Sequence, residues 1–446
     1  MDSQDGKATP ELKHQGAGRW LQKEMMSDYY RALSEAPEKG EPVAYLFISG
    51  NVGELMRAFG FHVCFPEVNA LQCGIKHISP QYLLRSEDAG YSADVCGYVK
   101  NDIGLLLSGN KTPFAHVPPP SLLVCNYAGC TTYIKWWEAL AEYYGCPIFV
   151  LDSPYNRLEH IRREDIDYVV GQLKELIAVC EQVTGRRFDI DRLRETLALA
   201  RQAEELWVKI LHACKHSPSP LDAYFEAVFL MAPIYTLRGT PQSVQYFQAV
   251  LQEIEERLAY GLGPVPQERF RIVMEGPPPW PKFRTFWEMF KGWGAVTVAS
   301  TYSKVGGLWD VTGRYHDPDH PLESIAEYTL NCYVNWSLPR RRQLLLDYAR
   351  DYSADGIVIH SVKSCRSFAA GEADFREEFS KELDIPTLLI ESDLIDPRYF
   401  SDAQMKNRID AFFESLEHRK YVAARAASLP SPNREGGGGE VQIRAD

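Results

Sequence analysis

Short apolar runs alternate with longer helical patterns in two parts of this sequence, residues 41–158 and residues 266–425. The runs are rich in β-branched residues, as is typical of buried parallel strands. They lie near residues 43–48, 121–125, 147–151, 271–275, 295–299, 356–360 and 386–391. Alternating strands and helices favour parallel sheets with helices on both faces. The pattern therefore predicts an α/β fold with two parallel-sheet domains.

Three further parts of the chain lack this alternation. Residues 1–40 contain one expected helix, Trp20 to Leu33, and are predicted to form an N-terminal helical arm. Residues 159–265 have the spacing of amphipathic helices and are predicted to form a helical segment between the two domains. The helices expected there cover residues 168–185, 191–214, 221–235 and 241–259. Residues 426–446 have no apolar pattern and end in a glycine-rich stretch, which predicts a disordered tail.

Composition narrows the classes of protein that fit. The chain has 446 residues, 45% of them hydrophobic, and a formal net charge of -12. This negative charge argues against nonspecific binding to nucleic acid or to anionic membranes, because nothing neutralises phosphates in bulk. No apolar run approaches the roughly 20 residues that span a bilayer, and no basic and apolar leader is recognised. We therefore expect a cytoplasmic protein with no nucleic-acid or membrane partner.

Cysteines carry the clearest chemical signal. Cys130 and Cys365 occupy the same place in two similar segments, each after an expected strand and at the start of an expected helix. Cys96 follows Ser92 and Asp94, either of which could cap a helix, so it also falls in a first turn. Unpaired amides and the positive end of the helix dipole stabilise a thiolate, which is the form of sulfur that binds metal. These three residues are the predicted metal ligands.

The other cysteines leave one alternative open. Cys125 precedes Cys130 by five residues, and it could be the ligand in its place, although it falls at the end of a strand. Cys73 and Cys332 could line a pocket. The remaining four are expected to be buried apolar residues: Cys64, Cys146, Cys180 and Cys214. Ten cysteines without a compact framework indicate reduced thiols rather than disulfides.

Spacing restricts the kind of metal site. No C-x2-C pair occurs, which argues against structural zinc, and ferredoxin spacings are also absent. Three thiolates could instead hold a four-iron cluster and leave one iron without a protein ligand. Neither a dinucleotide fingerprint nor a P-loop is present. If ATP is used, another chain binds it.

Loops after two strands of the second domain could form a substrate pocket. Residues 275–280 read Glu-Gly-Pro-Pro-Pro-Trp and place Trp280 beyond a strand end. Tyr302 and Lys304 follow the next strand, where a hydroxyl and an ammonium would suit a thioester or a phosphate, unless this is a plain solvated loop. Three consecutive arginines occupy positions 340–342. They are expected either to face solvent or to bind the phosphates of a nucleotide-bearing acyl group.

Together these motifs resemble those of one known family. The segments that carry the resemblance are 94–104 around Cys96, 129–138 around Cys130, 275–278, 304–308, 363–365 with Cys365, and 391–400, which reads Glu-Ser-Asp-Leu-Ile-Asp-Pro-Arg-Tyr-Phe. Over about residues 20–420 the chain closely resembles the benzoyl-CoA reductase and 2-hydroxyacyl-CoA dehydratase family. The resemblance implies two flavodoxin-like domains with a helical portion, and a 4Fe-4S cluster on Cys96, Cys130 and Cys365.

The resemblance also implies partners and an activity. The partners are a homologous cluster-bearing subunit, an ATP-hydrolysing iron–sulfur activator, reduced ferredoxin as donor and an aromatic acyl-CoA substrate. The expected reaction is ATP-dependent reduction of the benzoyl-CoA ring to a cyclic dienoyl-CoA. Alternatives are a lyase, the (R)-2-hydroxyacyl-CoA dehydratase, and a non-catalytic electron-relay or structural subunit. The sequence leaves open the acyl group, which of the two subunits binds it, the proton donor and the fourth ligand of the cluster.

Overall fold

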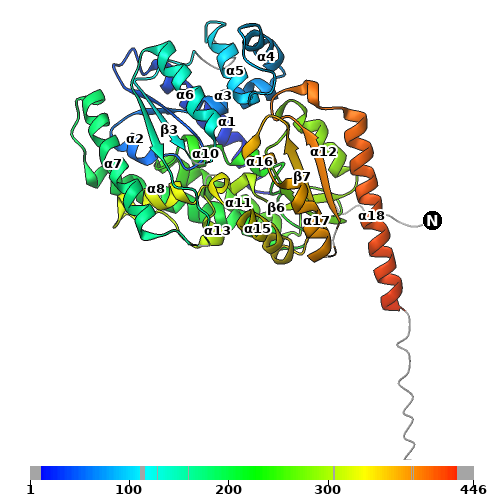
Figure 1. Cartoon of the computed structure of the whole chain (residues 1–446). Coiled ribbons are helices and arrows are strands. Elements are labelled where there is room, and N and C mark those ends of the chain that lie inside the picture. Colours follow the sequence, from blue (N-terminus) through cyan, green and yellow to red (C-terminus); the bar gives the residue numbers. More distant parts are fainter. Residues whose placement is uncertain are drawn as a thin grey trace, which may run out of the picture.

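Two four-stranded parallel sheets organise the chain (Figure 1). The computed structural model describes residues 12–428 except 111–115, 128, 159, 305, 306, 383 and 385. The strands of the first sheet have the order β2-β1-β3-β4, and those of the second have the order β6-β5-β7-β8. Counted within each sheet, both orders are 2-1-3-4, which is the flavodoxin-like order without its last strand. The predicted fold class is confirmed.

Helices pack against both sheets. The first sheet comprises β1 (Val43–Leu46), β2 (His62–Cys64), β3 (Leu122–Tyr127) and β4 (Ile148–Asp152). Its helices are α2 (Gly53–Ala58), α3 (Pro66–Ile75), α4 (Ser79–Asp88), α5 (Gly97–Leu106) and α6 (Thr131–Tyr144). The second sheet comprises β5 (Phe270–Glu275), β6 (Ala295–Ser300), β7 (Gly356–Val362) and β8 (Thr387–Ser392). Around it lie α-helices and short 3-10 helices, which are labelled η. They are η2 (Trp280–Lys282), α12 (Phe283–Lys291), η3 (Tyr302–Lys304), α13 (Trp309–Thr312), α14 (Pro321–Leu330), η4 (Tyr333–Asn335), α15 (Leu338–Asp351), α16 (Arg366–Ala369), α17 (Glu372–Glu382), η5 (Pro397–Tyr399) and α18 (Asp402–Ser428).

The N-terminal helix packs on the helical segment. This segment comprises α7 (Arg163–Thr184), α8 (Ile190–His212), η1 (Ala213–Lys215), α9 (Ala227–Leu230), α10 (Ala232–Thr236) and α11 (Pro241–Ala259). Helix α1 (Ala17–Glu35) contacts α9, α10 and α11. The helix expected from Trp20 to Leu33 is therefore confirmed with slightly wider bounds. The proposed domain boundaries stay predictions.

One predicted long helix was wrong. Residues 221–235 form a turn followed by the short helices α9 and α10. The Asp222 carboxylate accepts the backbone N–H groups of Tyr224 and Phe225, at 3.0 and 2.7 Å, and that of Thr297 in β6, at 2.9 Å. These contacts hold the segment against the second sheet in a non-helical turn. Pro233 then prevents α9 and α10 from forming one continuous helix, because it has no backbone N–H to donate.

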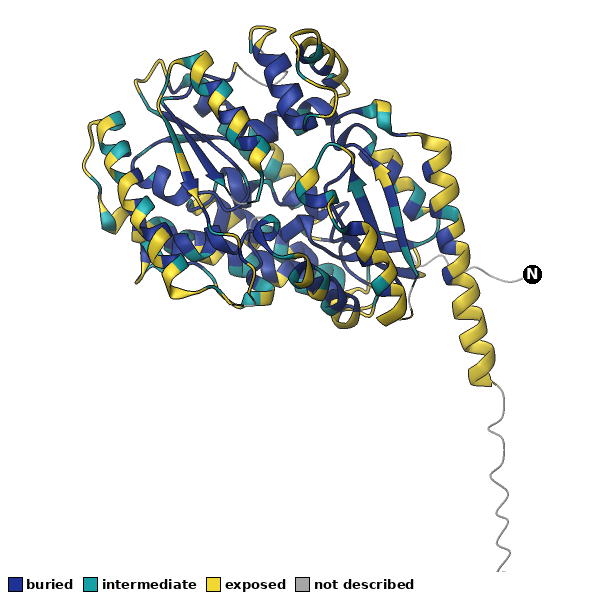
Figure 2. Cartoon of the chain, viewed as in Figure 1, coloured by how far each residue is buried: buried dark blue, intermediate teal, exposed yellow. Residues whose placement is uncertain are grey.

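Burial follows the layers of the fold (Figure 2). Strands β1, β5 and β6 are buried throughout, whereas the edge strand β4 is partly exposed. The first half of α18 packs its apolar residues on the second sheet, and its last turns are exposed. Residues 426–428 of the predicted tail belong to this helix, and 429–446 lie outside the described residues.

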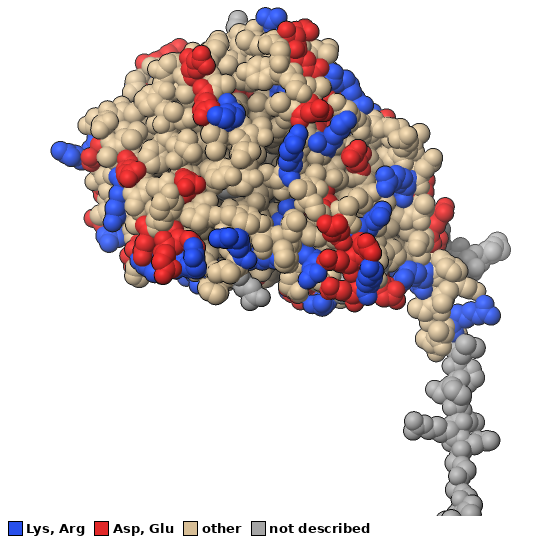
Figure 3. Space-filling view, viewed as in Figure 1, with Lys and Arg blue, Asp and Glu red and all other residues tan. Residues whose placement is uncertain are grey.

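The surface shows no single dominant charge in the view of Figure 3. Charged side chains of both signs gather along the lower edge of this face, and its middle is largely uncharged. Among the helices of the described residues, none combines the length and the apolar character needed to cross a membrane.

Candidate active site

A cavity of about 290 Å³ lies where the carboxyl ends of the central strands of both sheets converge. Its walls include Ser49 after β1, Cys130 after β3, Trp280 after β5 and Cys365 after β7. In each sheet the two central strands flank the point where the strand order reverses, and open α/β sheets bind ligands beyond that point. The two binding positions therefore share one cavity, here called the central cavity.

The three predicted metal ligands line the central cavity and occupy equivalent positions in their helices. Cys96, Cys130 and Cys365 are the N-cap residues of α5, α6 and α16. The backbone of Cys130 (φ -126, ψ 93) nearly matches that of Cys365 (φ -108, ψ 92). The repeated strand, turn and helix in the sequence therefore produce the same local geometry in both domains.

Burial keeps these thiols neutral unless a cation joins them. It is the largest influence on all three and raises the pKa of Cys96 and of Cys130, and that of Cys365 to about 12. Negative charge on the neighbouring thiols raises the pKa of Cys96 further, while the N–H groups of Tyr98 and Val99 lower it. A bound metal would supply the missing positive charge and release the thiol protons.

At least one of the distances between the three thiol sulfurs is longer than a mononuclear site requires. Among the described residues, the three thiols do not form a group whose ligand atoms all lie within 4.8 Å of one another. Tetrahedral zinc with bonds of about 2.3 Å to sulfur holds its thiolates about 3.8 Å apart. The arrangement therefore suits a larger polynuclear group.

Cys125 lies elsewhere. It is fully buried in β3, where its backbone pairs with Val150 of β4, and it is not among the residues that line the central cavity. Cys73 and Cys332 also do not line it, although the Cys332 Sγ lies 2.7 Å from the Ser49 Oγ on its wall. The other four cysteines are buried or half-buried and lie away from the cavity: Cys64, Cys146, Cys180 and Cys214.

Gly129 allows the turn that presents Cys130. Its φ is +83, and a Cβ at this position would lie 2.3 Å from the carbonyl oxygen of Val334. Gly145, at the end of α6, also has a positive φ of +62 but has open space around it. Of these two glycines, only Gly129 combines a left-handed backbone with the close approach of another segment.

We expect Gly129→Ala to destabilise the metal-free protein by at least about 2 kcal/mol more than Gly145→Ala. The control substitution costs about 1 kcal/mol, which is the penalty of a left-handed alanine alone. Urea denaturation followed by circular dichroism measures both values. Equal losses would mean that the contact with Val334 relaxes freely.

A buried carboxyl that the sequence did not single out also faces the cavity. Glu67, at the start of α3, accepts the Ile48 N–H at 2.6 Å and the Tyr133 hydroxyl at 2.9 Å. Burial raises the pKa of Glu67 to about 7. An acid in the first turn of a helix ordinarily complements the helix dipole, so its position in the sequence gave no signal of a buried site.

Aromatic side chains from both domains form another wall. The Trp280 indole N–H donates to the Tyr98 hydroxyl at 2.7 Å, and that hydroxyl lies 3.4 Å from the Tyr302 hydroxyl. All three residues line the cavity. Trp280 and Tyr302, two of the residues predicted for a substrate pocket, therefore line the central cavity together with Tyr98. Their role toward a substrate stays a prediction.

Lys304, the third residue predicted for the substrate pocket, lies outside the central cavity. It is buried, forms an ion pair with Asp310, lies 3.9 Å from the centre of the Tyr348 ring and does not line the cavity. Burial lowers the pKa of Lys304. The structure therefore places its ammonium inside the second domain, away from the pocket to which the sequence assigned it.

The arginine cluster is also only partly at the surface. Arg341 is buried and donates to Glu275 at 2.8 Å, while Arg342 forms a 2.5 Å ion pair with Glu378. Glu275 additionally accepts the Tyr333 hydroxyl. These contacts anchor the end of β5. Arg341 therefore stabilises the fold, and it neither faces solvent nor binds phosphates.

One further group has the composition of a metal site. Glu54, Glu204 and His316 are buried with ligand atoms within 4.8 Å of one another. The Arg238 guanidinium forms ion pairs with both carboxylates. That internal cation pairs with both carboxylates and offsets part of their negative charge, so the group is best explained as a buried ionic network.

Fold and cavity together define a two-domain α/β protein with a thiol-lined pocket between its domains. The family described as "2-hydroxyglutaryl-CoA dehydratase, D-component" matches residues 53–416. The chain belongs to this family, and the resemblance recognised from the motifs is confirmed.

Several relatives match nearly the full chain. A benzoyl-CoA reductase subunit of Thauera aromatica is 44% identical over 416 residues, covering 91% of this chain and 96% of the relative. The (R)-2-hydroxyisocaproyl-CoA dehydratase alpha subunit of Clostridioides difficile is 27% identical, covering 89% and 95%. The alpha subunit of (R)-2-hydroxyglutaryl-CoA dehydratase from Acidaminococcus fermentans is 24% identical, covering 89% and 96%.

Proposed function

We propose that this chain is the iron–sulfur subunit of an ATP-dependent aromatic acyl-CoA reductase that acts on benzoyl-CoA or a close analogue. The observation that carries the proposal is the convergence of three N-cap thiols, a buried carboxyl and an aromatic wall on one cavity. The similarity to the benzoyl-CoA reductase subunit of Thauera aromatica supports the reductase over the dehydratases, which are less similar.

Cys96, Cys130 and Cys365 would hold a 4Fe-4S cluster. The donor set fits: it has three sulfurs, each at a helix N-terminus, and they are spread more widely than one ion requires. Such a cluster, when bound, would supply single electrons at low potential. Its remaining iron would lack a protein ligand from this set.

The central cavity is too small to hold the whole of a CoA ester. Its volume of about 290 Å³ lies just below the usual range of small-molecule sites, about 300–1,000 Å³, and a cluster on the three thiols would occupy part of it. The pantetheine and nucleotide would therefore extend beyond it. Trp280, Tyr98 and Tyr302 would pack against the aromatic ring and exclude water, which protects a reduced ring from side reactions.

Glu67 would hold one of the two protons that reduction of the ring to a dienoyl-CoA consumes. A carboxyl with a pKa of about 7 is about half protonated at neutral pH and can donate from its wall of the cavity. Adding an electron to an aromatic ring costs resonance stabilisation, and the thioester carbonyl lowers that cost by accepting negative charge. Prompt protonation then makes the addition irreversible.

Other chains would complete the system. Reduced ferredoxin would donate electrons to an ATP-hydrolysing iron–sulfur activator, and a homologous cluster-bearing subunit would pair with this chain. The sequence of this chain has no nucleotide motif, which agrees with ATP binding elsewhere. We expect the complex in the cytoplasm.

Counting electrons tests the proposal. We expect the chain, purified anaerobically with its partners and supplied with ATP, to consume about two electrons per benzoyl-CoA and to release a dienoyl-CoA, because ring reduction uses its electrons stoichiometrically. Conversion of a 2-hydroxyacyl-CoA after only a trace of reductant would indicate the lyase instead. Photolabelling by an acyl-CoA analogue confined to the partner subunit would indicate an electron relay.

A further inference from the structure

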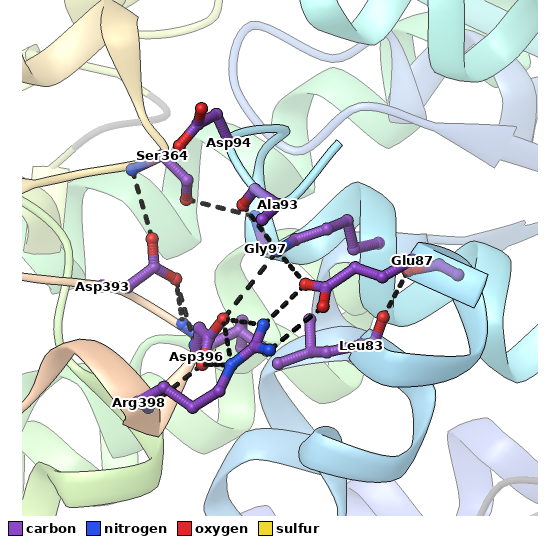
Figure 4. Close-up of polar contacts among 12 residues, drawn as sticks. Leu83, Glu87, Ala93, Asp94, Gly97, Ser364, Asp393, Asp396 and Arg398 are labelled. Atoms are coloured by element: carbon purple, nitrogen blue, oxygen red, sulfur yellow. Dashed lines mark hydrogen bonds and ion pairs between the residues drawn. The ribbon is translucent and has the colours of Figure 1, made fainter. Parts of the chain in front are cut away.

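A network of polar side chains joins the helix of Cys96 to the loop of Cys365 (Figure 4). One half of it centres on Arg398 of η5, which follows β8. The Arg398 guanidinium donates to both oxygens of Glu87 in α4, at 2.6 and 3.0 Å, and also to Asp396 at 2.8 Å. A planar guanidinium bridging two carboxylates fixes their relative orientation as well as their charge.

Lys100 connects this half to the helix of Cys96. Its ammonium is buried, donates to Glu87 at 2.9 Å and to the Ala93 carbonyl at 2.7 Å, and lies 3.8 Å from Asp396. Lys100 lies one turn into α5, and its backbone N–H bonds the carbonyl of Cys96 at 3.1 Å. Two cations and two carboxylates therefore tie α4 and α5 to the end of the second sheet.

The other half reaches the residues next to two of the thiols. The Asp393 carboxylate accepts the Ser364 N–H at 3.2 Å and the N–H groups of Ile395 and Asp396 at 3.0 Å. The Ser364 hydroxyl in turn accepts the Gly97 N–H at 3.2 Å. Gly97 follows Cys96 and Ser364 precedes Cys365, so one serine joins the neighbours of the two thiols.

Close packing reinforces this contact. A Cβ at Gly97 would lie 2.9 Å from the Asp393 Oδ1 and 3.0 Å from the Cβ of Ile395. On the other side of Cys365, the Ser367 hydroxyl donates to the Gly129 carbonyl at 2.8 Å, beside Cys130. Serines flanking Cys365 therefore bind the loops of both other cysteines.

We propose that Glu87, Lys100, Ser364, Asp393, Asp396 and Arg398 form an interdomain clamp that sets the spacing between Cys96 and Cys365 before any metal binds. The inference rests on the proposed function for its purpose, which is to hold a cluster. Cys96 and Cys365 belong to different domains, and movement between domains is the default without strong contacts. The clamp residues are positioning residues, and they explain the Asp393-to-Arg398 motif of the sequence.

Crosslinking of the metal-free protein tests the clamp. In a Cys130→Ser background, reduced full-length protein is treated with dibromobimane, and the Cys96–Cys365 bridge is measured by peptide mass spectrometry. We expect Ser364→Ala and Arg398→Ala to lower the rate of bridging roughly fivefold, as the loss of about one hydrogen bond would. The control is Lys282→Ala, which breaks a 2.7 Å ion pair with Asp402 within the second domain and should leave the rate unchanged.

Unfolding curves separate positioning from general stability. Ser364→Ala removes a single hydroxyl, so it carries the test if Arg398→Ala fails to fold. Equal bridging rates in folded Ser364→Ala, folded Arg398→Ala and wild-type protein would overturn the clamp. A rate lowered equally by Lys282→Ala would also overturn it, because general loosening would then be sufficient.

Iron retention gives a second and independent measurement. In the cluster-loaded protein, we expect the clamp variants to lose iron to a chelator several times faster than wild type and Lys282→Ala. If the wild-type chain holds no iron, the proposed function fails, yet the bridging rates still decide whether the clamp exists. Retention at the wild-type rate in every variant would contradict the clamp.

Discussion

Replacing Cys130 by alanine is expected to remove the cluster, so that iron falls from about four per chain to fewer than about one. Cys130 caps α6 and lines the central cavity with Cys96 and Cys365. Two remaining thiolates cannot neutralise and enclose a four-iron group. Iron and sulfide analysis of anaerobically purified protein, with the absorbance and electron paramagnetic resonance spectra, measures the result.

Cys125→Ala is the matched control. Cys125 lies five residues earlier in β3, is fully buried and does not line the cavity. Burial raises the pKa of Cys125 to about 12, and nothing in its surroundings favours the thiolate. We expect this variant to keep its iron. Equal iron contents in the two variants would refute the choice of Cys130 over Cys125.

Replacing Glu67 by glutamine is expected to slow turnover strongly. Glutamine keeps the size of the side chain and a carbonyl acceptor, but it lacks the carboxyl proton that can be donated. We expect the turnover rate for benzoyl-CoA to fall by about 10²- to 10⁴-fold, which is the usual contribution of a positioned acid. Iron content should not change, because Glu67 contacts Ile48 and Tyr133 rather than a thiol.

The pH dependence of the activity gives a second test of Glu67 as the proton donor. Burial raises the pKa of Glu67 to about 7, so the protonated form that donates is present below pH 7 and is lost above it. Activity of the wild-type complex should therefore decline as pH rises through about 7. In Glu67→Gln the residual activity should lack that decline.

Asp102→Asn is the control for this effect. Burial also raises the pKa of Asp102 to about 7, but its carboxylate accepts the Trp136 indole N–H at 3.0 Å and does not line the central cavity. Its substitution should leave the alkaline decline in place. Loss of the decline in Asp102→Asn, or its persistence in Glu67→Gln, would show that Glu67 is not the donor.

Much of the fold could be predicted because its signals are local. A run of β-branched residues favours a strand whatever surrounds it, and strands β3, β5, β7 and β8 lie where their runs are. The repeated pattern around Cys130 and Cys365 predicted two helix N-termini, and both residues are N-caps. The helix expected over residues 221–235 was wrong because Asp222 binds the N–H of Thr297, 75 residues away.

The sequence by itself determined the two α/β domains and the helix starts that carry the cysteines, since backbone preferences and apolar spacing act within a few residues. Only the tertiary structure decided which side chains meet. It brings Tyr98 to Trp280 and Gly97 to Ser364 across the two domains, turns Glu67 into a buried acid, and withdraws Lys304 into an ion pair with Asp310. Burial and contact depend on packing between segments far apart in the chain, and no local pattern encodes that packing.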